Sequence, residues 1–337
     1  MPDITALIKE LRMRKKRHES IPINYSKALR TAASAVLFAL LLFTFEPAEA
    51  FAYDFILLDY IPQKESVKSD KQIMDDLSSL ELKSANALLI RLDDARTLLR
   101  RNSEVRTYPA SLTKMMTALV VIEQTEDLSE EIILEERIFE RLRSANASMA
   151  GFRPGVKITI RDLLYGIMLP SGAEASLGLA EHIAGSESAF VELMNQKAEI
   201  LGMNSTNFMN TTGLHHPEHY STAEDMAVLL QYALKNRDFA RIFTEEEYLA
   251  AEDPDGGSGH KLYSTLFMKL KSFKRNSLNG EILGGKTGYT REAGLCLASY
   301  ARISGQKYIL ITMGAPGNLY TEQLSVTDAL AIYRRIR

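Results

Sequence analysis

The chain has 337 residues and a net charge of −3, which gives no support for nucleic-acid binding, because proteins that bind nucleic acids usually carry a basic face. Hydrophobic residues make up 46% of the sequence and charged residues 25%, enough apolar material for a large core in one domain or two interlocked subdomains. The single cysteine, Cys296, excludes an intramolecular disulfide and lies in an apolar run, so we interpret it as a small core residue.

The first fifty residues have the features of an export signal. Eight lysines and arginines between residues 9 and 30 precede the charge-free segment TAASAVLFALLLFTF at 31–45, and Ala48-Glu49-Ala50 supplies a small-x-small site. This apolar run is shorter than the roughly 20 residues that span a bilayer. We therefore expect residues 1–50 to be a signal peptide cleaved after Ala50, with an uncleaved anchor in the cytoplasmic membrane as the alternative. Both interpretations predict an exported protein, at the outer face of that membrane or in the cell wall.

The next segments predict a spacer followed by a hairpin. Residues 51–83 become polar and charged after their first turns, which is typical of a spacer with a weak helix. The run NALLIRLD at 86–93 is almost wholly apolar and predicts a buried strand. Residues 96–100 follow after a short polar turn, and we expect them to form its hairpin partner.

A helix is predicted to begin near Ser111, in the stretch PASLTKMM. Its apolar residues recur at helical spacing and define one buried stripe, with Ser111 at the margin and Lys114 on a neighbouring azimuth. One interpretation is a serine N-cap followed by an ordinary solvated lysine. The other is a nucleophile with its base, because a serine hydroxyl needs a neighbour to take its proton and a desolvated lysine can do so. Taken alone, the pair favours the cap, so the choice depends on what else the chain carries.

The middle third of the chain is predicted to be helical throughout. Thr159 opens an amphipathic helix that Pro170 stops at Ser171. Further helices are expected over residues 173–184, 188–201 and 221–234. The last of these begins with the capping-box pattern Ser221-Thr222-Ala223-Glu224.

The last third predicts strands and one helix. Short apolar or alternating runs at 282–289, 295–303 and 308–313, parted by turn residues, indicate three successive antiparallel strands. A helical stripe that includes Val326 and Tyr333 closes the chain. We therefore expect an α+β fold: an antiparallel sheet of about five strands built from both chain ends and flanked by helices. An all-helical lobe, residues 111–250, is inserted in it, and the cleft between the lobes is a natural place for a site.

Two later triplets give the Ser111 and Lys114 pair a chemical context. Ser171-Gly172-Ala173 lies 60 residues after Ser111, and Lys286-Thr287-Gly288 lies 115 residues after Ser171. The ordered set S-x-x-K, S-x-N and K-T-G is that of penicillin-binding proteins and class A β-lactamases. Each triplet alone is also compatible with an ordinary turn or strand end. Three of them in the right order favour a composite active site.

The matching blocks extend well beyond the triplets. YPASLTKMMTAL, RDLLYGIMLPSGAEA, LGMNSTNFMNTTGLHHPEHYSTAEDMA and GGKTGYTREAGLCL together make residues 84–337 resemble the low-molecular-mass penicillin-binding D-alanyl-D-alanine carboxypeptidases. The resemblance implies a β-lactamase/transpeptidase-like fold without cofactor or metal. It also implies removal of the terminal D-alanine from peptidoglycan stem peptides, and acylation by β-lactam antibiotics.

The resemblance implies a role for each matching residue. Ser111 is expected to attack the carbonyl between two terminal D-alanines, Lys114 to take its proton, and Ser171 to relay a proton to the leaving D-alanine. On the substrate side, Lys286 is expected to supply positive potential and Thr287 to bind the terminal carboxylate. The remaining positions act through the backbone: Gly288 leaves room for substrate, and the N–H groups of Ser111 and Tyr289 stabilise the oxyanion.

One departure from the family pattern is Ala173, where the family usually has an asparagine that contacts the lysine and the substrate. Losing one such hydrogen bond costs about 1–3 kcal/mol. A penicillin-binding sensor with poor turnover is therefore an alternative function. A D,D-transpeptidase is another, because it shares the acyl-enzyme. A β-lactamase is disfavoured because no E-x-x-x-N motif is found; Glu192 and Asn195 are one residue too close.

The remaining motif is the histidine group His215, His216 and His219. Pro217 interrupts the spacing and no carboxylate pattern completes a zinc motif, so we expect a surface loop and no metal site. The chain ends 51 residues after Lys286, so we also expect it to lack the β-rich C-terminal domain of many relatives.

Overall fold

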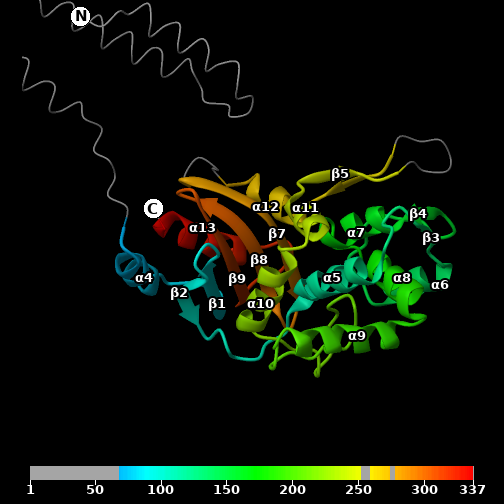
Figure 1. Ribbon diagram of the computed structural model, residues 1–337, viewed down its shortest axis with the longest axis horizontal. Helices are drawn as coiled ribbons and strands as arrows, with labels where there is room; N and C mark the ends of the chain where they lie inside the picture. Colours follow the sequence, from blue (N-terminus) through cyan, green and yellow to red (C-terminus); the bar gives the residue numbers. More distant parts are fainter. Residues whose placement is uncertain (1–67, 252–258, 274–277, 337) are drawn as a thin grey trace, which may run out of the picture. The chain divides into compact units, whose positions relative to one another are not determined.

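The computed structural model describes residues 68–251, 259–273 and 278–336 (Figure 1). The expected signal peptide or anchor at residues 1–50, and the first part of the expected spacer, lie outside the described residues. Within the described ranges, none of the helices combines the length and the apolar character needed to cross a bilayer.

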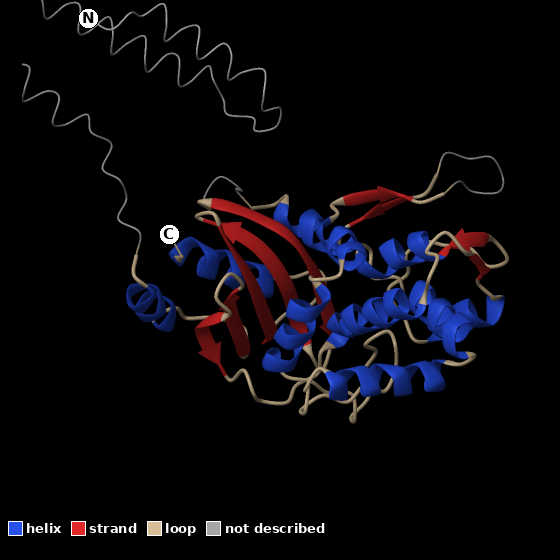
Figure 2. Cartoon of the chain, viewed as in Figure 1, coloured by secondary structure: helices blue, strands red, loops and turns tan. Residues whose placement is uncertain are grey.

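A five-stranded antiparallel sheet is the centre of the fold (Figure 2). Its order is β2-β1-β9-β8-β7, so the two strands before the helical region lie beside the three strands that follow it. This confirms the predicted α+β fold, in which strands from before and after the helical region form one sheet. The strands are β1 (Asn86–Arg91), β2 (Arg96–Arg101), β7 (Gly280–Thr290), β8 (Gly294–Ile303) and β9 (Gln306–Ala315).

The two faces of the sheet are buried against different helices. Side chains alternate along each strand, so Leu88 and Ile311 contribute to one hydrophobic cluster while Leu89 and Leu310 contribute to the other. The first cluster also holds most of the apolar residues of the helical region, and Cys296 is buried in it as predicted. The second face is covered by α4 (Asp70–Ser78), α12 (Thr265–Leu270) and α13 (Leu324–Arg335).

The chain between β2 and β7 forms the helical region. Its elements are the 3-10 helix η1 (Ala110–Thr113), α5 (Lys114–Gln124), α6 (Glu136–Ser144), α7 (Ile160–Met168), α8 (Ala173–Ala184), α9 (Glu187–Ile200), α10 (Ala223–Ala233) and α11 (Arg237–Thr244). The prediction that this region is helical throughout is wrong. Two small antiparallel sheets interrupt it, one of β3 (Glu131–Ile133) with β4 (Lys157–Thr159), the other of β5 (Glu247–Leu249) with β6 (Lys261–Tyr263). Strands of three residues carry too little periodicity to be recognised in the sequence.

Two helix starts differ from the predictions. The helix expected at Ser111 opens as η1, and regular α-helix begins only at Lys114. The capping box expected at Ser221 is shifted by one residue: Thr222 is the N-cap, and its side chain accepts the amide of Asp225 at 3.0 Å. Ser221 is unavailable because its backbone pairs with Thr107, so tertiary pairing overrides the local capping signal.

The last part of the expected spacer, residues 51–83, includes a regular helix. Helix α4 buries Ile73 and Leu77 in the second cluster, and the carboxylate of Asp70 forms an ion pair with Arg91 of β1 at 2.7 Å. The part of the spacer from residue 68 onward is therefore packed against the sheet.

Candidate active site

Ser111 lies on η1 in a strained setting. Ala110, directly before it, adopts a left-handed conformation with φ +46°, which costs energy for a residue with a side chain. The loop that contains Gly213 lies directly against it: a Cβ at Gly213 would lie 1.9 Å from the carbonyl oxygen of Ala110. Only glycine permits this approach, and Gly213 itself has φ +80°. The serine is thus positioned by contact with a distant loop and remains partly exposed.

Lys114 begins α5 and is buried, with 2% of its side chain exposed. Its Nζ lies 3.4 Å from the Ser111 Oγ and donates to the Thr212 carbonyl at 2.6 Å. Burial lowers the pKa of Lys114 to about 7, and the charge of Glu174 opposes this decrease. The cap interpretation of the serine is wrong, because η1 and α5 show no side-chain cap and the lysine is not solvated. The arrangement places an amine that can be neutral near pH 7 beside a serine hydroxyl.

Ser171 lies in the turn between α7 and α8, with φ +71° and 5% exposure. Among the described residues its Oγ has no hydrogen-bond partner. A buried hydroxyl without a hydrogen-bond partner is less stable than one hydrated by water. The position therefore favours a ligand that forms a hydrogen bond with it. Two residues earlier, the Leu169 carbonyl accepts the backbone amide of Thr265 at 3.1 Å, which ties this turn to the start of α12.

Lys286 is fully buried on β7, which lies at one end of the strand order. Its Nζ donates to the Thr287 carbonyl at 2.9 Å. Burial holds the pKa of Lys286 well below its usual value, and the positive charges of Lys114 and Lys269 lower it further. Two lysines from distant segments therefore share one desolvated region, and each disfavours the charged form of the other.

The two residues after Lys286 contact both sides of the site. The Thr287 hydroxyl shares a hydrogen bond of 2.7 Å with the hydroxyl of Thr265. At Gly288, an added Cβ would lie 3.0 Å from the backbone nitrogen of Ser111, so β7 passes directly against η1. Tyr289 follows and is partly buried. The structure thus brings the first and third motifs into contact, and Thr265 links the third motif to the Ser171 turn.

Three residues of this region were not singled out from the sequence. Thr212 and Thr265 carry no local signal, because their contacts with Lys114 and Thr287 depend on loops far along the chain. Glu174 is buried in α8 directly after Ala173. A glutamate inside the apolar run AEASLGLA is a signal that could have identified it.

The three histidines are placed separately. His219 is buried, so the prediction of a surface loop is wrong for this residue. Its Nε2 forms a hydrogen bond with the Thr113 hydroxyl at 2.8 Å. Burial lowers the pKa of His219 to about 4, so it is neutral at physiological pH. His215 packs edge-on to Tyr108 with ring centroids 4.7 Å apart. The described residues contain no group of three or more side chains suited to a metal ion.

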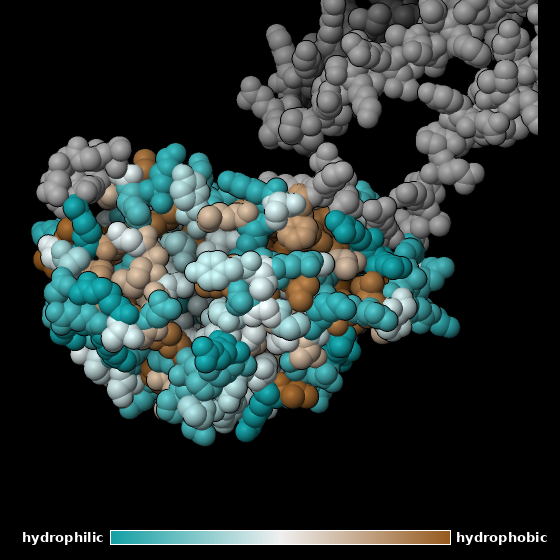
Figure 3. Space-filling view, turned by 180° about the vertical axis from the view of Figure 1, so that it is seen from behind, coloured by the Kyte–Doolittle hydropathy of each residue, from teal (hydrophilic) through white to brown (hydrophobic). Residues whose placement is uncertain are grey.

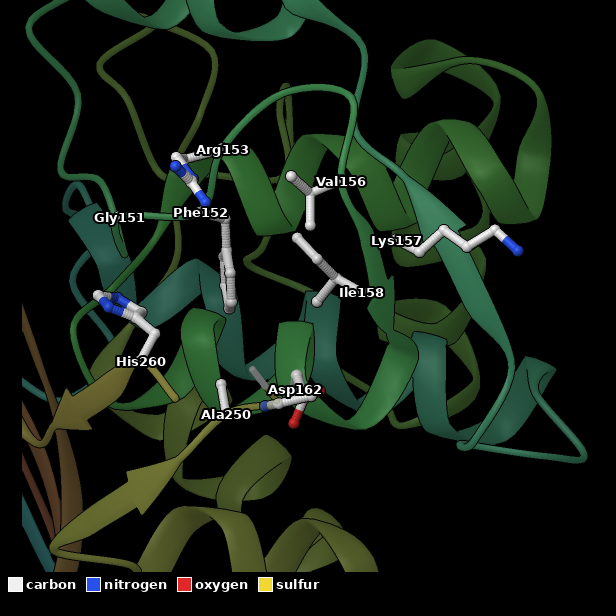
Figure 4. A pocket seen from close by; sticks show the side chains of 10 residues that line it. Gly151, Phe152, Arg153, Val156, Lys157, Ile158, Asp162, Ala250 and His260 are labelled. Atoms are coloured by element: carbon white, nitrogen blue, oxygen red, sulfur yellow. The ribbon is translucent and has the colours of Figure 1, made fainter. Parts of the chain in front are cut away.

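A cavity of about 200 Å³ lies elsewhere in the helical region, between the segment around Phe152 and His260 beside β6 (Figure 4). Asp162 lines it, and its carboxylate accepts the Tyr248 hydroxyl at 2.8 Å. The lining residues include none of the predicted site residues, so the hollow is distinct from the Ser111 region.

Comparisons with known proteins agree with this geometry. The family model for D-alanyl-D-alanine carboxypeptidase matches residues 71–317. The D-alanyl-D-alanine carboxypeptidase DacF of Bacillus subtilis is 34% identical over 261 residues, which cover 77% of this chain and 64% of DacF. That of Streptomyces sp. strain K15 is 30% identical and covers 69% of this chain and 81% of the relative. DacA of Haemophilus influenzae is 32% identical, but this chain spans only 56% of it.

The solved structures give the same result. The crystal structure of the Streptomyces K15 DD-transpeptidase matches with a TM-score of 0.68 at 26% identity, and the match covers 76% of this chain and 98% of that one. The fold, the order of the three motifs and the family match over more than half of the chain lead to one conclusion. This chain belongs to the D-alanyl-D-alanine carboxypeptidase family, peptidase family S11.

Proposed function

We propose that this protein is a serine-type D,D-carboxypeptidase that removes the terminal D-alanine from peptidoglycan stem peptides. The observation that carries the proposal is the Lys114 amine, desolvated, with its pKa lowered to about 7, and 3.4 Å from the Ser111 hydroxyl. A general base is most effective when its pKa lies near the working pH. Family membership supplies the class of substrate.

Acylation begins when neutral Lys114 takes the Ser111 proton. The Ser111 Oγ then attacks the carbonyl carbon of the penultimate D-alanine, and the carbonyl oxygen becomes an oxyanion. The backbone N–H groups of Ser111 and Tyr289 are the donors that would stabilise it. The close passage of Gly288 against the Ser111 amide supports this pairing, because it brings the two backbone segments together.

Collapse of the tetrahedral intermediate breaks the peptide bond. The proton held by Lys114 passes through the Ser171 hydroxyl to the leaving amine, and D-alanine departs. Water then attacks the ester on Ser111, with Lys114 again accepting a proton. The Ser171 Oγ, unpartnered among the described residues, supports a hydroxyl reserved for this transfer.

Recognition of the substrate depends on its terminal carboxylate. The negative charge of a bound carboxylate favours the protonated form of Lys286, which then supplies positive potential, and the Thr287 hydroxyl donates a hydrogen bond to the carboxylate. A β-lactam presents a carboxylate and a reactive carbonyl in a similar relation. We therefore expect penicillin to acylate Ser111 through the same steps.

The test is D-alanine release from a synthetic peptide ending in D-Ala-D-Ala, together with the mass of the adduct formed with penicillin. The wild-type protein should release D-alanine and gain one penicillin, whereas Ser111→Ala should do neither. Ser144→Ala, at an exposed serine of α6, is the matched control and should behave as wild type. Release by Ser111→Ala at the wild-type rate would exclude Ser111 as the nucleophile.

Transfer to an amine acceptor is the second candidate activity, because the structural relative from Streptomyces K15 is named a DD-transpeptidase. The acyl-enzyme is common to both reactions, and only the acceptor differs. Adding a glycyl peptide or D-amino acid to the assay distinguishes them by the mass of the product. A stable acyl-enzyme with neither product would instead favour a sensor, the role that Ala173 keeps open.

Residues 1–50 support a further part of the proposal, export to the outer face of the cytoplasmic membrane or the cell wall. The basic leader and the apolar run at 31–45 are typical of such a signal. The mass of the native N-terminus distinguishes the two forms: cleavage after Ala50 leaves Phe51 first, and an anchor retains the leader.

A further inference from the structure

Glu174 is a fully buried carboxyl group that the proposed mechanism does not use. It lies on α8, three residues after Ser171 and directly after Ala173, with no exposed surface. Burying a carboxylate costs free energy unless it is paired and hydrogen-bonded. The surroundings of this side chain therefore indicate what it does.

One carboxylate oxygen fastens a neighbouring loop. The Glu174 Oε1 accepts the backbone amides of Ala150 at 2.7 Å and Gly151 at 2.9 Å. In the same place the Ala173 amide donates to the Ser148 carbonyl at 2.8 Å. These bonds join the segment 148–151 to the start of α8.

The turn that carries Ser171 is enclosed by this contact. A Cβ added at Gly172 would lie 2.6 Å from the Ala150 Cβ and 3.0 Å from the Glu174 Oε2. The loop, the turn and the carboxyl group are thus packed as one unit. Release of the loop would free the turn that orients the Ser171 hydroxyl.

The second oxygen of Glu174 takes no part in fastening the loop, because both amides bond Oε1. Among the described residues the Glu174 Oε2 has no hydrogen-bond partner. Its charge acts on Lys114 and opposes the effect of burial there.

Few other charges act on Lys114. Lys286 from β7 is the like charge, and His219, beside Thr113, is neutral above about pH 4. Of the other ionisable groups on the helices packed around α5, Glu192, Glu199 and Arg237 are exposed, and several have partners of their own. These pairs are Glu123 with Lys197, Asp162 with Tyr248, Asp225 with Thr206, and Glu187 with Arg141.

We propose that Glu174 is a positioning residue of the active site, which fastens the loop 148–151 behind the Ser171 turn and supplies a negative charge that favours the ammonium form of Lys114. The inference rests on the proposed function for its catalytic meaning. The two roles are separable, because Glu174→Gln keeps an oxygen that accepts the two amides but removes the charge. Glu174→Ala removes both.

The first experiment is the pH profile of acylation by a fluorescent penicillin, from pH 5 to 9. In Glu174→Gln the Lys114 ammonium loses its stabilising partner, so the ascending limb should move to lower pH by about one unit. Glu181→Gln, which removes a partly buried glutamate of the same helix that pairs with Arg137, should leave the limb in place. A limb in Glu174→Gln that coincides with the wild-type limb would overturn the electrostatic role.

The second experiment is independent of activity. Hydrogen exchange at the Ala150 and Gly151 amides should be fast in Glu174→Ala and slow in wild type and Glu174→Gln. Equal protection in all three proteins would overturn the fastening role.

Titration of Lys114 by NMR, with its signal identified by its loss in Lys114→Arg, reports the same charge effect without any turnover. A wild-type protein inert to penicillin and peptide would thus refute the proposed function, while the NMR and exchange results decide the role of Glu174.

Discussion

Lys114 and Lys286 place two ammonium groups in one desolvated region, and this arrangement sets the acid–base behaviour of the site. Burial favours the neutral amine, and each lysine disfavours the protonated form of the other. Because the pKa of Lys114 is about 7, the fraction of free base rises as the pH rises through 7. We expect acylation by penicillin to rise over the same interval, which a stopped-flow pH series would measure.

Lys114→Arg tests the base directly. An arginine stays protonated throughout the accessible pH range, so it cannot take the serine proton. Acylation should fall by about two to four orders of magnitude, and its rise through pH 7 should disappear. Lys157→Arg, at an exposed lysine of β4, is the control and should match wild type. Wild-type acylation by Lys114→Arg would contradict the assignment of the base.

Thr265→Val tests the hydrogen bond to Thr287. A substrate carboxylate only accepts, so Thr287 must donate to it, and its oxygen is then free to accept from Thr265. Valine keeps the shape and removes the hydroxyl, so KM for the peptide should rise about fivefold, equivalent to a net hydrogen bond of about 1 kcal/mol. The value of kcat should be unchanged, and Thr265→Ser should restore KM. An unaltered KM in Thr265→Val would show that this hydroxyl does not orient Thr287.

At the scale of elements, the site depends on one loop and one strand that pack against η1. The loop that contains Gly213 contacts the Ala110 carbonyl, and Gly288 of β7 lies against the Ser111 amide. The Thr212 carbonyl on the same loop accepts the Lys114 ammonium. Movement of this loop would therefore alter the nucleophile and its base together.

Gly213→Ala is expected to break this contact. The added methyl would lie 1.9 Å from the Ala110 oxygen, so η1 or the loop must shift and acylation should fall at least tenfold. Gly202→Ala is the matched control, since Gly202 has a similar φ of +77° but no atom within 4 Å of the added Cβ. It should lose only about 1–3 kcal/mol of stability and keep full activity. Equal acylation rates for the two variants, compared at a temperature where both are folded, would contradict the role of this contact.

At the scale of the molecule, the sheet separates two hydrophobic clusters that pack against different helices. One joins the sheet to the helices that carry Ser111 and Lys114 and to α7 and α8, which flank Ser171; the other lies under α4, α12 and α13. On the face opposite to that of Figure 1, surface hydrophobic residues form dispersed patches among hydrophilic ones (Figure 3). Stability and catalysis should therefore respond separately to changes in the second cluster near α4.

Leu77→Ala tests this separation. Leu77 is almost wholly buried in the second cluster, so its truncation should cost about 2–5 kcal/mol in the free energy of unfolding, measured with urea. Acylation at 25 °C should be unchanged in the folded protein. Met74→Ala, at an exposed residue of the same helix, should change neither quantity by much. A loss of acylation in folded Leu77→Ala would show that α4 is coupled to the site.

The sequence by itself determined the five strands of the main sheet on either side of a helical middle, the fold class and the three motifs, because these depend on local periodicity and on residue types at short spacing. Only the tertiary structure decided that Lys114 and Lys286 share a desolvated region, that Ser111 is held by Gly213, and that His219 is buried. Likewise, the short strands β3 to β6 and the contacts of Glu174 and Thr265 could not be predicted. Burial, pKa values and loop contacts arise from residues far apart in the chain, and no local pattern records which distant segment will lie against a given side chain.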